Sequence, residues 1–140
     1  MKVVIVYESL TGNTRRAAEL MGELLLEQGV DTTVCPITNI DYQALALADV
    51  VVVGGWVDGL FFIGQRPGRA SRLESFPPID GKRCFVFCTY AIDPGRTLEK
   101  LTRIMERRGA EVLGGMTIKR TRLEQGAREF VDRLLQVVPA

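Results

Sequence analysis

Short apolar runs recur along the chain, and segments with helical spacing separate them. The first run, Val3 to Tyr7, is rich in β-branched residues, which is typical of a strand buried on both faces. Further runs extend over 30–35, 49–55, 83–90 and 112–118. Alternation of this kind predicts an α/β fold with a five-stranded parallel sheet, doubly wound in the order 2-1-3-4-5, with helices on both faces.

Apolar residues at helical spacing predict a helix over Asn13–Gln28 and a last helix over Gln125–Val138. Shorter helices are expected over Asp41–Ala48 and Arg69–Ser75, and another from Pro94 to Arg108, with Pro94 in the first helical position. The stretch from 56 to 68 contains several glycines and ends near prolines, and it is expected to be a loop.

Length and composition indicate one domain over residues 1–140. The net charge of +1 gives no indication of nucleic-acid binding, and no apolar run approaches the roughly 20 residues that span a bilayer. The first residues lack the features of a secretory signal, so a cytoplasmic protein is expected. The chain has no histidine, which excludes histidine-based catalysis and most zinc sites, and neither a catalytic residue nor a metal ligand is predicted.

Three cysteines stand at positions 35, 84 and 88. Cys84 and Cys88 fall in one predicted strand and would lie roughly 13 Å apart, too far to form a disulfide with each other. Reduced, buried thiols are therefore expected.

The loop after the first strand reads YESLTGNT and leads directly into a helix. In doubly wound sheets, ligands bind beyond the carboxyl ends of the strands, at the point where the strand order reverses. The free N–H groups of a helix start, with hydroxyls from Ser9, Thr11 and Thr14 and a flexible Gly12, suit a phosphate group. The alternative is a simple helix cap by Thr11 or Asn13. Neither the nucleoside triphosphatase motif nor the common dinucleotide fingerprint is present.

The stretch from Ser9 to Thr14, with the preceding Val-Ile-Val-Tyr and the following Ala17 and Ala18, resembles the phosphate loop of flavodoxins. Element order and length resemble short-chain flavodoxins over the whole chain. The resemblance implies bound FMN with its phosphate at this loop. The implied FMN-binding residues are Ser9, Leu10, Thr11, Gly12, Asn13 and Thr14, together with Gly55, Trp56, Val57, Asp58, Gly59, Thr89, Tyr90, Ala91 and Gly95.

Trp56 stands where flavodoxins often place an aromatic residue that stacks on the flavin, and the alternative is a core tryptophan. In flavodoxins a peptide of this loop flips when the flavin gains one electron. Val57 is β-branched and resists the positive φ that such a flip requires, so two-electron chemistry becomes more plausible. In the loop after the fourth strand, Tyr90 is expected on the floor of the site and Asp93 as a turn and helix-cap residue.

The near-neutral charge departs from the acidic character of many flavodoxins. One segment combines arginines with apolar residues, which indicates either a helix face that packs inward or a basic, apolar rim around the flavin; these residues are Arg66, Arg69 and Arg72 with Phe61, Phe62 and Ile63. A second basic cluster, Lys119, Arg120 and Arg122, is predicted to be solvated.

These features favour an FMN-binding electron carrier that serves a redox partner protein, with a reductase or ferredoxin-type donor and an acceptor enzyme. The alternative is a small FMN-dependent oxidoreductase that acts directly on a quinone or another small acceptor. Two further readings are a flavodoxin-like binding module without FMN, and a phosphorylated receiver domain. The receiver domain needs paired aspartates after the first strand, where Glu8 stands alone. The oligomeric state stays open.

Overall fold

Five parallel strands build the central sheet of the computed structural model, which describes residues 1–60 and 63–139. Along the sheet the order is β2-β1-β3-β5-β6, which confirms the doubly wound topology predicted from the sequence. The strands are β1 (Lys2–Tyr7), β2 (Asp31–Pro36), β3 (Val50–Leu60), β5 (Arg83–Tyr90) and β6 (Glu111–Lys119).

The valine-rich strands occupy the centre of the sheet because both of their faces are covered. Residues 3–6 of β1 and 50–53 of β3 are all buried, and the two strands pair in parallel from Val3 with Val50 onward. Continuous apolar runs fit such positions, whereas strands with one face exposed to solvent alternate apolar and polar residues.

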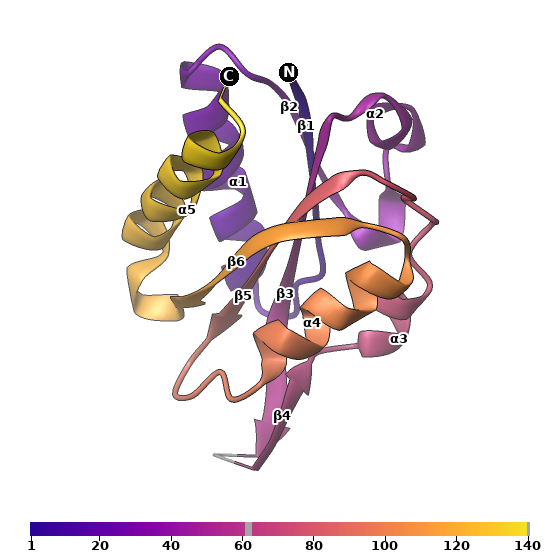
Figure 1. Cartoon of the computed structure of the whole chain (residues 1–140). Coiled ribbons are helices and arrows are strands. Elements are labelled where there is room, and N and C mark those ends of the chain that lie inside the picture. Colours follow the sequence, from indigo (N-terminus) through magenta and orange to yellow (C-terminus); the bar gives the residue numbers. More distant parts are fainter. Residues whose placement is uncertain (61–62, 140) are drawn as a thin grey trace.

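Helices lie on both faces of this sheet (Figure 1). The pair α1 (Asn13–Glu27) and α5 (Leu123–Val137) covers one face, and side chains of α2 (Tyr42–Leu47), α3 (Ala70–Glu74) and α4 (Thr97–Arg107) join the core on the other. Two short 3₁₀ turns, η1 (Ile37–Asn39) and η2 (Arg120–Arg122), complete the connections.

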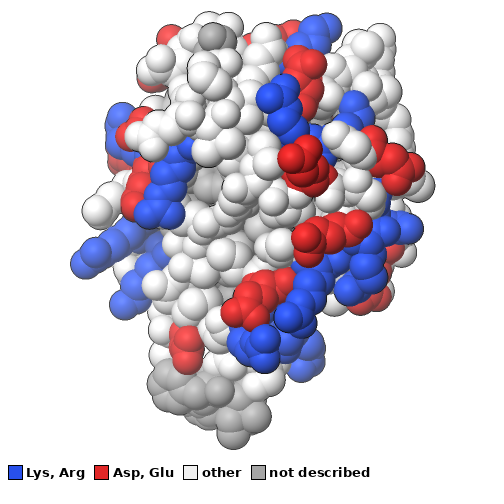
Figure 2. Space-filling view, in the orientation of Figure 1, with Lys and Arg blue, Asp and Glu red and all other residues white. Residues whose placement is uncertain are grey.

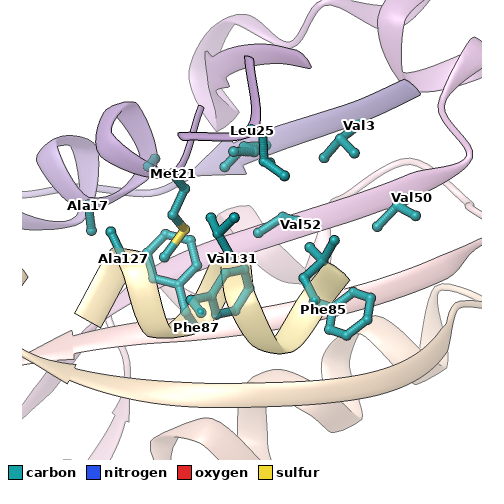
Figure 3. Close-up of a cluster of buried hydrophobic side chains, with 14 of the residues drawn as sticks. Val3, Ala17, Met21, Leu25, Val50, Val52, Phe85, Phe87, Ala127 and Val131 are labelled. Atoms are coloured by element: carbon teal, nitrogen blue, oxygen red, sulfur yellow. The ribbon is translucent and has the colours of Figure 1, made fainter. Parts of the chain in front are cut away.

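The two helices of the first face meet the sheet through a dense apolar cluster, which Figure 3 shows in part. Phe87 of β5 packs edge-to-face against Phe130 of α5, with ring centroids 5.7 Å apart. Phe87 also fills the space in front of Gly54, where an added Cβ would lie 2.1 Å from the Phe87 ring. The neighbouring strand therefore requires glycine at the point where it leaves the core.

The expected helix start at Pro94 is wrong, since α4 begins three residues later. Asp93 Oδ1 accepts a hydrogen bond from the Gly95 N–H at 2.9 Å, and the Pro94 carbonyl accepts one from the Thr97 N–H at 3.1 Å. These bonds form a turn that precedes the helix. Asp93 is thus a turn residue, as expected, but it does not cap the helix.

The expected loop from 56 to 68 is a β-hairpin. After leaving the parallel sheet, β3 continues to Leu60 and pairs antiparallel with β4 (Ile63–Pro67), with Val57 opposite Pro67 and Asp58 opposite Arg66. Gly59 has a φ of 147° beside a register shift, and Pro67 ends the strand. Gly59 therefore marks an irregular pairing within the hairpin, and Pro67 marks the end of its second strand. The hairpin projects beyond the parallel sheet in Figure 1.

All three cysteines are free and buried, as expected. No helix within the described ranges is long and apolar enough to cross a membrane.

Burial raises the pKa of Cys84 and of Cys88 to about 12. We expect neither thiol of the folded protein to react with a disulfide reagent at pH 9, whereas all three should react after denaturation, because only a thiolate attacks. The folded state should also lose stability as the pH rises from about 9 toward 12, since in that window only the unfolded chain ionises these two thiols. Rapid labelling of Cys84 or Cys88 in the folded protein would contradict this assignment.

Candidate functional site

A cleft of about 170 Å³ lies at the carboxyl ends of the parallel strands, where the sequence predicts the ligand site. Ten of the fifteen predicted site residues line it, and Arg120 is added: the lining consists of Ser9, Leu10, Thr11, Asn13, Thr14, Trp56, Val57, Thr89, Tyr90, Ala91 and Arg120.

The loop after β1 turns into α1 through Gly12, whose φ of 97° is a left-handed conformation that glycine adopts readily. The cap of this helix is neither Thr11 nor Asn13. Instead, Ser9 Oγ accepts hydrogen bonds from the backbone N–H groups of Gly12 at 3.2 Å and Arg15 at 3.3 Å. Because the Ser9 oxygen only accepts in these bonds, its hydroxyl hydrogen remains free to donate to an anion.

The two threonines of this loop differ in their surroundings. Thr11 is exposed, and its Oγ1 accepts from Asn13 Nδ2 at 3.3 Å. Thr14 is 1% exposed, and its hydroxyl lies 2.7 Å from Thr89 Oγ1 and donates to the Gly55 carbonyl at 3.3 Å. Thr14 therefore ties the helix start to the ends of β3 and β5, while Thr11 and Ser9 keep donor capacity toward the cleft.

Trp56 is half-buried and lines the cleft, so it is not a core tryptophan. Its Nε1–H donates to Glu8 Oε2. The indole also packs against Gly68, where an added Cβ would lie 2.0 Å from ring atom Cε2. These two contacts fix the orientation of the ring at the edge of the cleft.

Glu8 is the centre of a charged network that the sequence did not reveal. Its side chain is 1% exposed and accepts from Arg72 Nη1 at 2.6 Å and from Arg69 Nη1 at 3.4 Å, in addition to the indole. A buried carboxylate needs such partners to offset its lost hydration. Glu8 thereby connects the end of β1 to the end of the hairpin and to α3.

The segment of arginines and apolar residues is not one inward-packing helix, because it runs from β4 into the short helix α3. Arg69 and Arg72 bind Glu8, while Arg66 pairs with Asp58 at 3.4 Å across the hairpin. The remaining members of the predicted basic and apolar rim, Phe61, Phe62 and the side chain of Ile63, lie outside the described residues.

Arg120 is exposed, as predicted for its cluster, and it also lines the cleft, which the sequence did not indicate. The reason is the register of the sheet: Tyr90, at the end of β5, is opposite Lys119, at the end of β6. The residue after Lys119 therefore arrives beside the β5 loop. Arg120 is exposed and forms no ion pair with any described residue, so a guanidinium supplements the neutral donors of the loop.

Five predicted site residues do not line the cleft: Gly12, Gly55, Asp58, Gly59 and Gly95. Two of them pack against β4 instead. An added Cβ would lie 2.9 Å from the Gln65 Cα at Gly59, and 2.7 Å from the Gln65 Cβ at Gly95. Gly59 thus allows the two strands of the hairpin to approach each other, and Gly95 allows the loop after β5 to approach β4.

The residues of the cleft fit a flat ligand with a phosphate tail. Neutral donors, a helix start, the guanidinium of Arg120 and an aromatic ring held by Glu8 all line the same cleft. Comparison with known families agrees, since residues 4–135 match the model described as flavodoxin domain. The chain belongs to the flavodoxin family. Membership supports an FMN-binding electron-transfer protein.

Relatives of this flavodoxin are distant in sequence and close in fold. A flavodoxin from Clostridium beijerinckii is 23% identical over 128 residues, which cover 91% of this chain and 93% of that protein. A cysteine-to-serine mutant of flavodoxin from Pseudomonas aeruginosa superposes with a TM-score of 0.75 at 16% identity, over the full length of both chains. The two-electron reduced flavodoxin of Megasphaera elsdenii gives a TM-score of 0.70 at 22% identity, over 91% of this chain and 98% of that one.

Glu8 offers a direct test of the network. We expect Glu8→Ala to lower the free energy of unfolding by about 1–3 kcal/mol, because the indole N–H and two guanidinium groups lose their acceptor. The fluorescence of Trp56, the single tryptophan, should shift as its ring becomes free to move. Glu124→Ala is the matched control, since the Glu124–Arg128 pair is exposed and such pairs contribute little. Equal stability and an unchanged spectrum in Glu8→Ala would contradict the role of this carboxylate.

Proposed function

We propose that this flavodoxin binds FMN in the cleft and exchanges electrons with redox partner proteins in the cytoplasm. The observation that supports the proposal is the joining, in one cleft, of an anion-binding helix start, a fixed indole and the end of β5. When bound, FMN supplies the redox chemistry, and the protein binds it, orients it and shields one of its sides.

Each part of the cleft has a separate task in this proposal. The hydroxyls of Ser9 and Thr11 and the first N–H groups of α1 bind the phosphate, with added attraction from Arg120. Trp56 and Tyr90 border the ring. Thr14 contributes indirectly, by holding the loop in place through Thr89 and Gly55.

A cytoplasmic location is supported by the free thiols, because disulfides are rare in reducing compartments. Electron carriage is favoured over direct catalysis because the full sequence contains no histidine that could act as an acid or base on a small substrate. The donor would be a reductase or a ferredoxin-type protein, and the acceptor an enzyme.

One observation favours the second candidate, a small FMN-dependent oxidoreductase that acts on a quinone. The carbonyl of Trp56 accepts the Gly68 N–H at 2.8 Å, and the next residue, Val57, pairs with Pro67. The peptide between Trp56 and Val57 is thus fixed in the hairpin ladder, and its rotation would break a ladder hydrogen bond. A backbone that cannot adjust to one-electron reduction suits two-electron transfer.

The phosphate assignment is tested with Thr11→Val. We expect the affinity for FMN to fall by about 1.5–3 kcal/mol, the value of a hydrogen bond to a charged group, as measured by titration of flavin fluorescence. Thr33→Val is the matched control, because Thr33 lies within the edge strand β2 and does not line the cleft. The affinity of this variant for FMN should equal that of the wild-type protein. Failure of the wild-type protein to bind FMN at all would refute the proposed function.

Anaerobic photoreduction of the FMN-loaded protein tests whether the hairpin restrains the Trp56–Val57 peptide, and turnover then distinguishes the two candidates. Because the Trp56–Val57 peptide is held in the hairpin, we expect absorbance to pass directly to the two-electron-reduced form, with little one-electron intermediate. Turnover of a nicotinamide and a quinone by the protein alone would favour the oxidoreductase. A large, long-lived one-electron signal would show that the hairpin does not restrict the peptide.

A further inference from the structure

We propose that the surface around the cleft docks an acidic electron-transfer protein. This inference rests on the proposed function and specifies the chemistry of the partner. It follows from the distribution of charge, from the pairing of that charge, and from two exposed apolar side chains.

Charge is segregated between the two ends of the molecule. The segments at the carboxyl ends of the parallel strands, residues 8–16, 54–74, 90–100 and 119–124, carry ten Lys and Arg and six Asp and Glu. Their net charge of +4, against +1 for the whole chain, leaves −3 for the remainder. In Figure 2, a largely uncharged area toward the end at which the strands of Figure 1 point is bordered by Lys and Arg side chains, with Asp and Glu side chains among them.

Most of the acidic groups at this end are already engaged. Glu8 is buried between two arginines, Asp93 accepts a backbone N–H, and three others form ion pairs, namely Asp58 with Arg66, Glu99 with Arg96 and Glu124 with Arg128. By contrast, four exposed cations form neither an ion pair nor a side-chain hydrogen bond with the described residues: Arg16, Lys119, Arg120 and Arg122. The positive field at this end is therefore not cancelled locally.

Two large apolar side chains stand exposed beside the cleft. Leu10, which lines the cleft, is 52% exposed, and Ile92, which follows the lining residue Ala91, is 62% exposed. Protein interfaces combine an apolar centre with a polar rim, and the charge of the rim steers the encounter of the partners. An acidic protein matches both features, whereas a small anion would contact only the interior of the cleft.

Stopped-flow reduction of two haem proteins tests whether the preferred partner carries negative or positive charge. The FMN-loaded protein is reduced by light and mixed with soluble cytochrome b5, which is acidic, or with cytochrome c, which is basic. We expect the second-order rate with cytochrome b5 to fall by about tenfold between low and high ionic strength, as salt screens the attraction. The rate with cytochrome c should not fall. A rate that falls with salt only for cytochrome c would overturn the proposal.

Matched charge variants locate the surface. The double substitution Lys119→Gln and Arg122→Gln should lower the low-salt rate with cytochrome b5 by about three- to tenfold. The control pair, Arg83→Gln with Arg107→Gln, removes the same charge at the opposite end of the molecule, since Arg83 begins β5 and Arg107 ends α4. The control pair should leave the low-salt rate with cytochrome b5 nearly unchanged. Equal effects of the two pairs would show that only net charge matters, and would refute a local docking surface.

Two further measurements separate the other outcomes. Sedimentation with phosphatidylserine vesicles, combined with a salt-independent rate with cytochrome b5, would assign the positive surface to a membrane and overturn the proposal. If the protein fails to retain FMN, the proposed function fails, but binding of cytochrome b5 to the flavin-free chain can still be followed by NMR. Loss of that binding in Lys119→Gln with Arg122→Gln, and not in the control pair, would support the docking surface independently of the flavin.

Discussion

The buried carboxylate of Glu8 is the interaction on which the geometry of the site depends. Removal of a carboxylate from water costs several kcal/mol unless charged and polar donors replace the water. Here an indole and two guanidinium groups supply those donors, and they come from β3 and from the segment at the start of α3. The need to satisfy one anion therefore brings the hairpin and α3 against the end of β1, and it orients the tryptophan that borders the cleft.

A second polar tie acts in parallel on the other side of the cleft. The buried hydroxyl of Thr14 joins the start of α1 to Thr89 of β5 and to the Gly55 carbonyl of β3. Between them, the two buried groups connect the three strand ends that surround the ligand site. A binding site whose walls are fixed in this way loses little conformational entropy when a cofactor enters.

The elements that the sequence predicted correctly are those with a strong periodic signal. The valine runs of β1 and β3 and the long amphipathic pattern of α5 are each compatible with a single type of element. The loop after β1 follows from the position of Gly12 between β1 and α1. The hairpin was missed because glycine and proline normally interrupt strands, whereas here Gly59 and Pro67 stand at an irregularity and an end. Arg120 and Glu8 were missed for another reason: their roles depend on strand register and on contacts between distant segments, which no local pattern encodes.

The antiparallel strand β4 pairs with β3 alone and stands off the path of the parallel sheet. Its length and its tip can consequently change without any alteration to the pairing of the five parallel strands or to the start of α1. The base of the hairpin carries Trp56 and Val57 into the cleft, so only the outer part of the ribbon is free to diverge among descendants of one ancestor while the walls of the cleft are inherited intact.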